Sequence, residues 1–202
     1  MVIKLEKTGD FHNINLSKDY STDPVIVHVN LNWEAITNNR SGWIGKIFGS
    51  NSAPDLDLGC MYEMMNGEKG VIQPLGENFG SRKTSPYIYL DKDDRTGQAN
   101  DGENMYIFRP DLIQRILFFC FIYEGAEDFK SVRGRMFFKI SNDEEVYLEL
   151  NNPNSNCSFC VAALLKNINS QIMIVKEEKY FSGHKEADQF YKYGFNWVSG
   201  RK

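Results

Sequence analysis

Long apolar runs are missing from this sequence of 202 residues. The longest, residues 116–123, is far shorter than the roughly 20 apolar residues that a membrane-spanning helix needs. The first residues alternate charged and apolar side chains and do not form the apolar segment of a signal peptide. We therefore expect a soluble, cytoplasmic chain that does not insert into a membrane.

Clustered basic residues are also missing. The chain carries 23 Lys and Arg against 27 Asp and Glu, which gives a net charge of −4, and the basic residues are scattered. A surface that binds nucleic-acid phosphates needs a clustered basic face. We expect no nucleic-acid partner.

The cysteines do not have the spacing of a zinc site. Cys157 and Cys160 form a lone C-x-x-C without a second pair or nearby histidines. Cys60 and Cys120 lie in apolar runs, where a cysteine behaves as a small buried hydrophobe. Reactive thiols need exposure, so only Cys157 and Cys160 are candidates for thiol chemistry.

Short runs with a two-residue period are abundant. Residues 25–33 place valines, Leu31 and Trp33 on one face, which predicts a half-buried strand with His28 as an exposed or hydrogen-bonded structural histidine. Residues 116–123 are continuously apolar, which predicts a central strand buried on both faces. Further strands are predicted at 11–16, 55–63, 70–75, 86–90, 105–108, 135–141, 145–150, 158–165 and 171–178, with a hairpin turn at Asn66 and Gly67. This pattern favours an all-β fold, an antiparallel β-sandwich formed by one domain over residues 1–202.

The end of the chain has the composition of a helix, unlike the strand-like segments before it. Residues 184–193 have helical composition, with Ser182 as the expected N-cap and Gly194 as the expected stop. An apolar stripe would dock this short C-terminal helix on a sheet. Its members would be Ala187, Phe190 and Tyr191.

Acidic residues crowd into residues 91–104, where five carboxylates accompany glycines and asparagines. Such a loop repels itself and needs a cation or basic partners to hold one shape. Calcium takes roughly six to eight oxygen ligands in a flexible shell, which a glycine-bent acidic loop can supply. The segment is not an EF-hand, because Gly102 stands where the bidentate glutamate belongs. An ordinary solvated loop is the alternative.

A second acidic site lies upstream. Asp55 and Asp57 alternate with Leu56 and Leu58, so both carboxylates project from one face of a strand, about 7 Å apart. A metal ion held jointly with the downstream loop would offset their repulsion. The residues therefore favour a calcium-binding β module that is not an enzyme.

Together the two acidic sites resemble the TerD family of tellurium-resistance and stress-response proteins. The matching segments are Asp55-Leu-Asp57, Asp93-Asp-Arg-Thr-Gly97 and Asp101-Gly-Glu-Asn104. The TerA subgroup is the most similar, because residues 69–71, 121–126 and 180–184 also resemble the corresponding sequences of its members. The sequence departs from the family at Asp94, where Asn is common, and at Lys92, where Gly is common.

The resemblance implies a β-sandwich that binds calcium and has no established catalytic activity. It also implies a role in tellurite resistance and stress responses, within an assembly of Ter proteins at the inner face of the membrane. The inherited calcium ligands would be Asp55, Asp57, Asp93, Asp94, Asp101 and Glu103, and Glu124 falls near a further acidic position of the family.

Two other functions remain open from the sequence. A glycosidase-like hydrolase would need paired carboxylates in a deep pocket, with an isolated Glu63 or Glu124 as the acid. Direct handling of tellurite would use the thiolates of Cys157 and Cys160.

Overall fold

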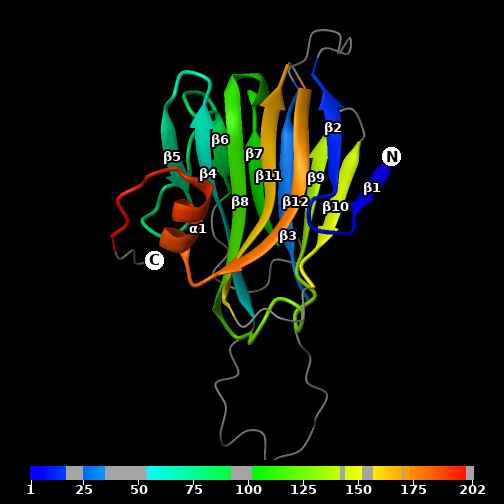
Figure 1. Cartoon of the computed structure of the whole chain (residues 1–202), viewed down its shortest axis with the longest axis vertical. Helices are drawn as coiled ribbons and strands as arrows, with labels where there is room; N and C mark the ends of the chain where they lie inside the picture. Colours follow the sequence, from blue (N-terminus) through cyan, green and yellow to red (C-terminus); the bar gives the residue numbers. More distant parts are fainter. Residues whose placement is uncertain are drawn as a thin grey trace, which may run out of the picture.

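Two six-stranded sheets pack face to face in the computed structural model, which describes residues 1–16, 25–34, 54–91, 102–141, 144–151, 157–169 and 171–198 (Figure 1). Sheet A has the strand order β1-β10-β9-β3-β7-β6, and sheet B has the order β2-β12-β11-β8-β4-β5. Neighbouring strands are antiparallel except β1 and β10, which are parallel. The predicted all-β sandwich is confirmed.

Every described strand except β1 overlaps a range predicted from the sequence, whereas no strand is predicted over residues 2–5. Sheet A contains β1 (Val2–Leu5), β3 (Val27–Asn32), β6 (Ile88–Leu90), β7 (Glu103–Ile107), β9 (Arg135–Ile140) and β10 (Glu145–Glu149). Sheet B contains β2 (Phe11–Asn15), β4 (Asp55–Met64), β5 (Lys69–Ile72), β8 (Ile113–Glu124), β11 (Phe159–Ile168) and β12 (Gln171–Phe181). A 3-10 turn (Pro110–Leu112) precedes β8, and the helix α1 (His184–Tyr191) follows β12.

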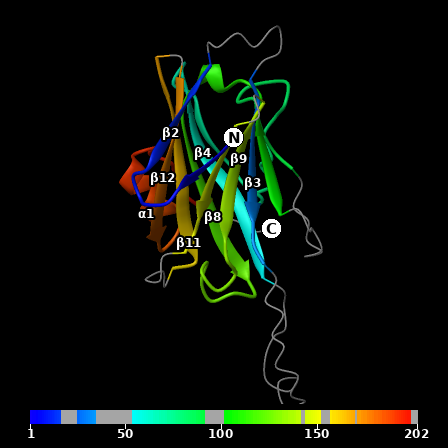
Figure 2. The same ribbon diagram turned by 90° about the vertical axis from the view of Figure 1, so that its right-hand side faces the viewer.

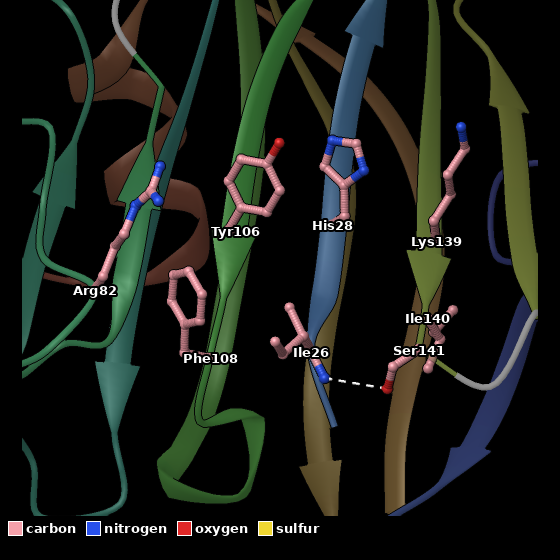
Figure 3. Close-up of a pocket in the computed structure, with 8 residues that line it drawn as sticks. All are labelled: Ile26, His28, Arg82, Tyr106, Phe108, Lys139, Ile140 and Ser141. Carbon is pink, nitrogen blue, oxygen red and sulfur yellow. Dashed lines mark hydrogen bonds between the residues drawn. The ribbon is translucent and has the colours of Figure 1, made fainter. Parts of the chain in front are cut away.

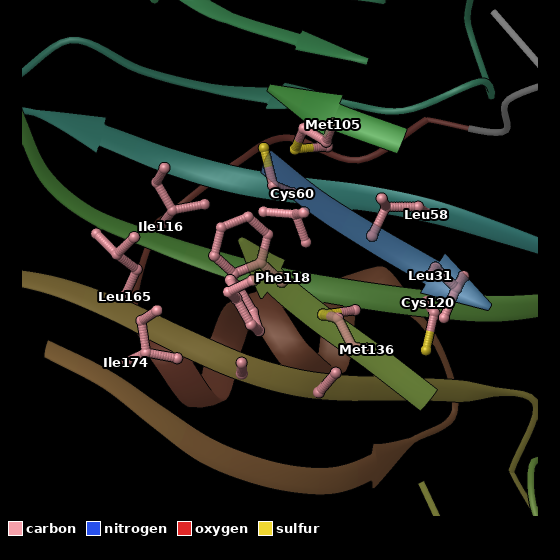
Figure 4. Packing of buried hydrophobic residues seen from close by; sticks show 14 of the residues in the cluster. Leu31, Leu58, Cys60, Met105, Ile116, Phe118, Cys120, Met136, Leu165 and Ile174 are labelled. Carbon is pink, nitrogen blue, oxygen red and sulfur yellow. The ribbon is translucent and has the colours of Figure 1, made fainter. Parts of the chain in front are cut away.

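The core lies between the sheets. Figure 4 shows Phe118 of β8 among side chains of both sheets, including Met136 of β9 and Leu165 of β11, all fully buried. The ring of Phe118 meets that of Phe138 edge to face at 5.1 Å. Every second residue of β3 is buried, as its sequence period predicts.

The outer face of sheet B is covered by α1 and the residues after it (Figure 2). This second cluster buries Phe119 and Leu117 of β8 against Ala187 and Tyr193. β8 is therefore buried on both faces, as its unbroken apolar sequence predicts. Asp188 fastens the tail, because its carboxylate accepts hydrogen bonds from Gly194 N at 2.7 Å, Phe195 N at 2.8 Å and Trp197 Nε1 at 2.9 Å.

The predicted details of the helix are wrong at both ends. The N-cap is Gly183, and the Ser182 hydroxyl instead donates to Glu186 Oε2 at 2.7 Å. The helix ends before Gly194, because Lys192 adopts the left-handed conformation with φ 60°. The buried face holds Asp188 beside Ala187, whereas Phe190 is 57% exposed. No helix in the described ranges has the length and apolar character needed to cross a bilayer.

Candidate metal centre

β4, which carries Asp55 and Asp57, begins at the lower end of the sandwich in Figure 1. Trp33 Nε1, just after β3, donates to Pro54 O at 2.9 Å and so fastens the end of β3 to the start of β4. β7 begins beside the same end of β3, because Glu103 stands opposite Leu31 in the register.

Asp57 is a fully buried carboxylate. Leu56, Leu58 and Cys60 face the core between the sheets, so the alternation of β4 directs Asp57 and Asp55 to the other face. Asp57 stands opposite Phe121 of β8. Burying a charged carboxylate is costly unless hydrogen bonds or positive charge offset it, so this position suits a cation ligand.

Glu103 reaches β4 from the opposite sheet. Its Oε2 accepts a hydrogen bond from the backbone N–H of Leu58, the residue that follows Asp57. This N–H is accessible because β5 pairs only with the part of β4 from Cys60 onward. This contact brings Glu103 to the backbone of β4 next to Asp57 in the sequence, and the sharing of one ion by the two segments stays a prediction.

The turn before β7 depends on a glycine. Gly102 has φ +67°, and a Cβ built there would lie 2.0 Å from the carbonyl oxygen of Leu31. Only glycine fits so close to another backbone, and this approach brings Glu103 to the end of β3.

Asp55 stands directly opposite Glu124 in the pairing of β4 with β8. Two like charges opposite each other destabilise a pair of strands unless something positive lies between them. Glu124 is exposed and Asp55 is half-buried. Glu124, the further acidic position that the family resemblance indicated, therefore lies beside Asp55 in the register.

The remaining predicted ligands, Asp93, Asp94 and Asp101, lie outside the described residues. Asp91, at the near end of their loop, is described, and its backbone N–H donates to Asn104 O at 2.8 Å. Within the described ranges, no group of three or more His, Cys, Asp or Glu side chains is arranged to hold a metal ion. The carboxylates present are hard oxygen donors of the kind that calcium prefers, and a complete shell would need oxygens from the loop.

Asn104 does not join the acidic site. Its Oδ1 lies 2.7 Å from His28 Nε2 and 3.0 Å from Asn30 Nδ2, on the outer face of sheet A. Neighbouring residues of a strand point to opposite faces, so the side chains of Glu103 and Asn104 lie on opposite faces of sheet A. The hydrogen bond predicted for His28 is confirmed.

The carboxylates proposed for a hydrolase have other roles. Glu63 pairs with Arg115 at 2.7 Å and with Lys69 at 3.5 Å. Burial alone would raise the pKa of Glu63, but the hydrogen bond and charge of Arg115, with help from Lys69, lower that pKa below its ordinary value. A general acid needs a raised pKa, so Glu63 does not fit that role, and Glu124 is exposed.

The cysteines are mostly inaccessible. Cys60, Cys120 and Cys160 are fully buried, and burial raises the pKa of the Cys60 and Cys160 thiols. The sequence makes Cys160 a candidate for thiol chemistry, and that prediction is wrong, because its side chain points from β11 into the core. Cys157, just before β11, is partly exposed.

The chain is similar in sequence to a named protein, although no protein-family model matches it. The two sequences are 34% identical over 178 residues. The relative is tellurium resistance protein TerA from Alcaligenes sp.

The similarity to TerA covers 87% of this chain but only 52% of the relative, so the chain spans about half the length of that protein. It supports a tellurium-resistance family for the chain. It does not confirm the TerD subgroup.

Proposed function

We propose that this chain is a calcium-binding, non-enzymatic module that contributes to tellurite resistance and related stress responses. In this proposal it acts as a calcium-dependent scaffold that binds other Ter proteins at the inner face of the membrane. The similarity to TerA supports the link to tellurium resistance. The ligands would come from Asp55, Asp57, Asp93, Asp94, Asp101 and Glu103, with Glu124 as a further donor.

The observation that carries the calcium site is the contact between the sheets at Glu103. Its carboxylate binds β4 at Leu58, directly beside the buried Asp57, and Asp55 stands opposite Glu124 on the same strand pair. A buried carboxylate and two like charges opposite each other are both stabilised by a nearby cation, which offsets the cost of burial and the repulsion. When bound, calcium would supply positive charge that joins the start of β4 to the loop before β7.

Calcium should stabilise the folded chain. Ligand at about a hundred times its dissociation constant adds about 2.7 kcal/mol to the free energy of unfolding, which raises the melting temperature by roughly 5–10 °C in a chain of this size. The measurement is thermal unfolding in calcium, in magnesium and in chelator. Asp57→Asn and Asp93→Asn should each remove most of the gain, because each deletes one negative charge from the site.

Glu77→Gln is the matched control, since it removes an exposed carboxylate that lies outside both acidic segments. It should keep the full calcium effect. Equal melting temperatures in calcium and chelator for the unsubstituted chain would refute the calcium site, whatever the variants do. Binding of other Ter proteins that persists in chelator would refute the scaffold role alone.

A further inference from the structure

The outer face of sheet A carries a hollow of about 530 Å³ that the acidic site does not use. It is lined by side chains from β3, β7 and β9, with one more from the loop before β6 (Figure 3). Its main members are Ile26, His28, Arg82, Tyr106, Phe108 and Lys139. The volume lies within the range of about 300–1,000 Å³ that is typical of small-molecule sites.

The hollow contains an aromatic platform made of rings that stack on one another. The rings of His28 and Tyr106 stack at 4.6 Å with only 7° between their planes, and Phe108 continues the row at 6.3 Å from Tyr106. The hydrogen bond between His28 Nε2 and Asn104 Oδ1 fixes the imidazole, and Asn30 Nδ2 fixes the Asn104 amide in turn. All three rings are only partly buried, so a planar ligand could stack on them.

Positive charge stands on both sides of this platform. The Arg82 guanidinium lies 4.2 Å from the Tyr89 ring centroid and 5.9 Å from that of Tyr106, and Lys139 rises from β9 on the other side (Figure 3). In the described part of the chain, neither side chain forms an ion pair. The acidic residue nearest in register, Glu145 opposite Lys139, is not within ion-pair distance of it. Both cations are therefore available to an anionic ligand.

We propose that this hollow binds a small planar aromatic anion of the nucleoside monophosphate class. The ring of the ligand would extend the stack of His28 and Tyr106 at an outer ring face, as bases stack on exposed aromatic side chains. Its anionic group would bind Arg82 or Lys139, and the planar fork of an arginine suits a phosphate. A single nucleotide fits better than a nucleic-acid strand, because two cations on a chain of net charge −4 do not form the basic track that a polynucleotide requires.

Calorimetric titration of the full chain with adenosine monophosphate tests the proposal. Adenosine alone and inorganic phosphate alone should each bind at least about tenfold more weakly, since each supplies half of the contacts. No binding of adenosine monophosphate at millimolar concentration would overturn the proposal. So would phosphate that binds as well as the nucleotide, or an oligothymidylate that binds at least tenfold more tightly per site.

Variants locate the site. Tyr106→Ala should weaken binding about tenfold, and so should whichever of Arg82→Gln and Lys139→Gln removes the cation that holds the anionic group. Arg82→Gln and Lys139→Gln change exposed side chains, so they remain informative if Tyr106→Ala does not fold. The matched controls are Phe190→Ala and Lys185→Gln on α1, which covers the opposite side of the sandwich, and neither should alter the affinity. Unchanged affinity in both Arg82→Gln and Lys139→Gln would overturn the site.

Discussion

His184 lies in an aromatic enclosure at the start of α1. Its ring is 4.7 Å from that of Phe159, 5.1 Å from Phe119 and 5.0 Å from Trp197. Its Nε2 atom is buried and has no hydrogen-bond partner among the described residues. Burial disfavours the charged imidazolium and lowers the pKa of His184 to about 4.

This lowered pKa makes stability depend on pH in a defined window. Above pH 6.5 the histidine is neutral in both states, so the folded state keeps its full stability. Between pH 6.5 and 4 the unfolded state binds a proton that the folded state does not, so the free energy of unfolding falls as the pH falls. We expect a loss of about 2 kcal/mol across this window, after allowance for the partial exposure of the ring.

Denaturant unfolding of the parent chain and of His184→Phe between pH 4 and 7 measures this effect. Phenylalanine has no proton to bind and suits a site lined by aromatic rings, so the variant should have a flatter profile in that window. The same slope in both proteins would show that His184 does not contribute.

At the residue scale, the sequence predicts part of the acidic site. Charge crowding and family resemblance both predict that Asp55 and Asp57 share a site with the segment that contains Glu103, and the structure shows Glu103 at the backbone of Leu58, the residue after Asp57. The sequence does not predict that Lys176 and Glu178, two members of a charged run, form a buried ion pair. Lys176 Nζ lies 2.9 Å from Glu178 Oε2. The pairing of β11 with β12 shifts register between Val161 and Ala163, and such a shift changes which side chains face the core without leaving a local signal.

At the scale of elements, Arg115 attaches α1 to sheet B. It projects from β8 and donates to Glu63 Oε2 at 2.7 Å and to Tyr191 O, the last residue of the helix, at 2.8 Å. Its guanidinium also lies 4.1 Å from the Tyr193 ring centroid. Arg115 thus satisfies a carbonyl at the helix end and neutralises a largely buried carboxylate.

Arg115→Met should destabilise the chain by about 2 kcal/mol, because it leaves Glu63 with Lys69 as its remaining cation. Hydrogen exchange should accelerate in α1 and in the residues after it, while the strands keep their protection. The matched control is Arg109→Met, which breaks an exposed pair with Asp111 and should change stability by less than about 1 kcal/mol. Equal exchange in α1 of the parent and the Arg115 variant would contradict the anchoring role.

The strands themselves are largely predictable, since alternation or continuous apolarity marks β3, β4 and β8 directly. β1 is different. Its four residues pair in parallel with β10, which lies about 140 residues later in the chain. The partner of an edge strand depends on long-range register and packing, which a short local pattern does not encode.

At the scale of the whole molecule, the two surfaces described above lie on opposite sides of one strand. Glu103 of β7 faces β4 and the acidic site, and its neighbour Asn104 supports the aromatic platform on the outer face of sheet A. An ion that orders the start of β7 would therefore act on both. The chain spans about half the length of TerA, and growth in tellurite tests whether the chain takes part in resistance.

Growth in tellurite distinguishes the proposed calcium site from thiol chemistry. In a tellurite-sensitive bacterial host, expression of the chain should raise the tolerated tellurite concentration. Asp57→Asn should reduce that tolerance toward the level of the empty vector, because it removes a charge from the calcium site. Cys157→Ser should leave it unchanged, since Cys157 is the partly exposed thiol and the proposal gives it no role.

All variants are compared at equal protein level, with Glu77→Gln as the control. Tolerance that survives Asp57→Asn but is lost in Cys157→Ser would reverse the assignment and make the thiol the functional group.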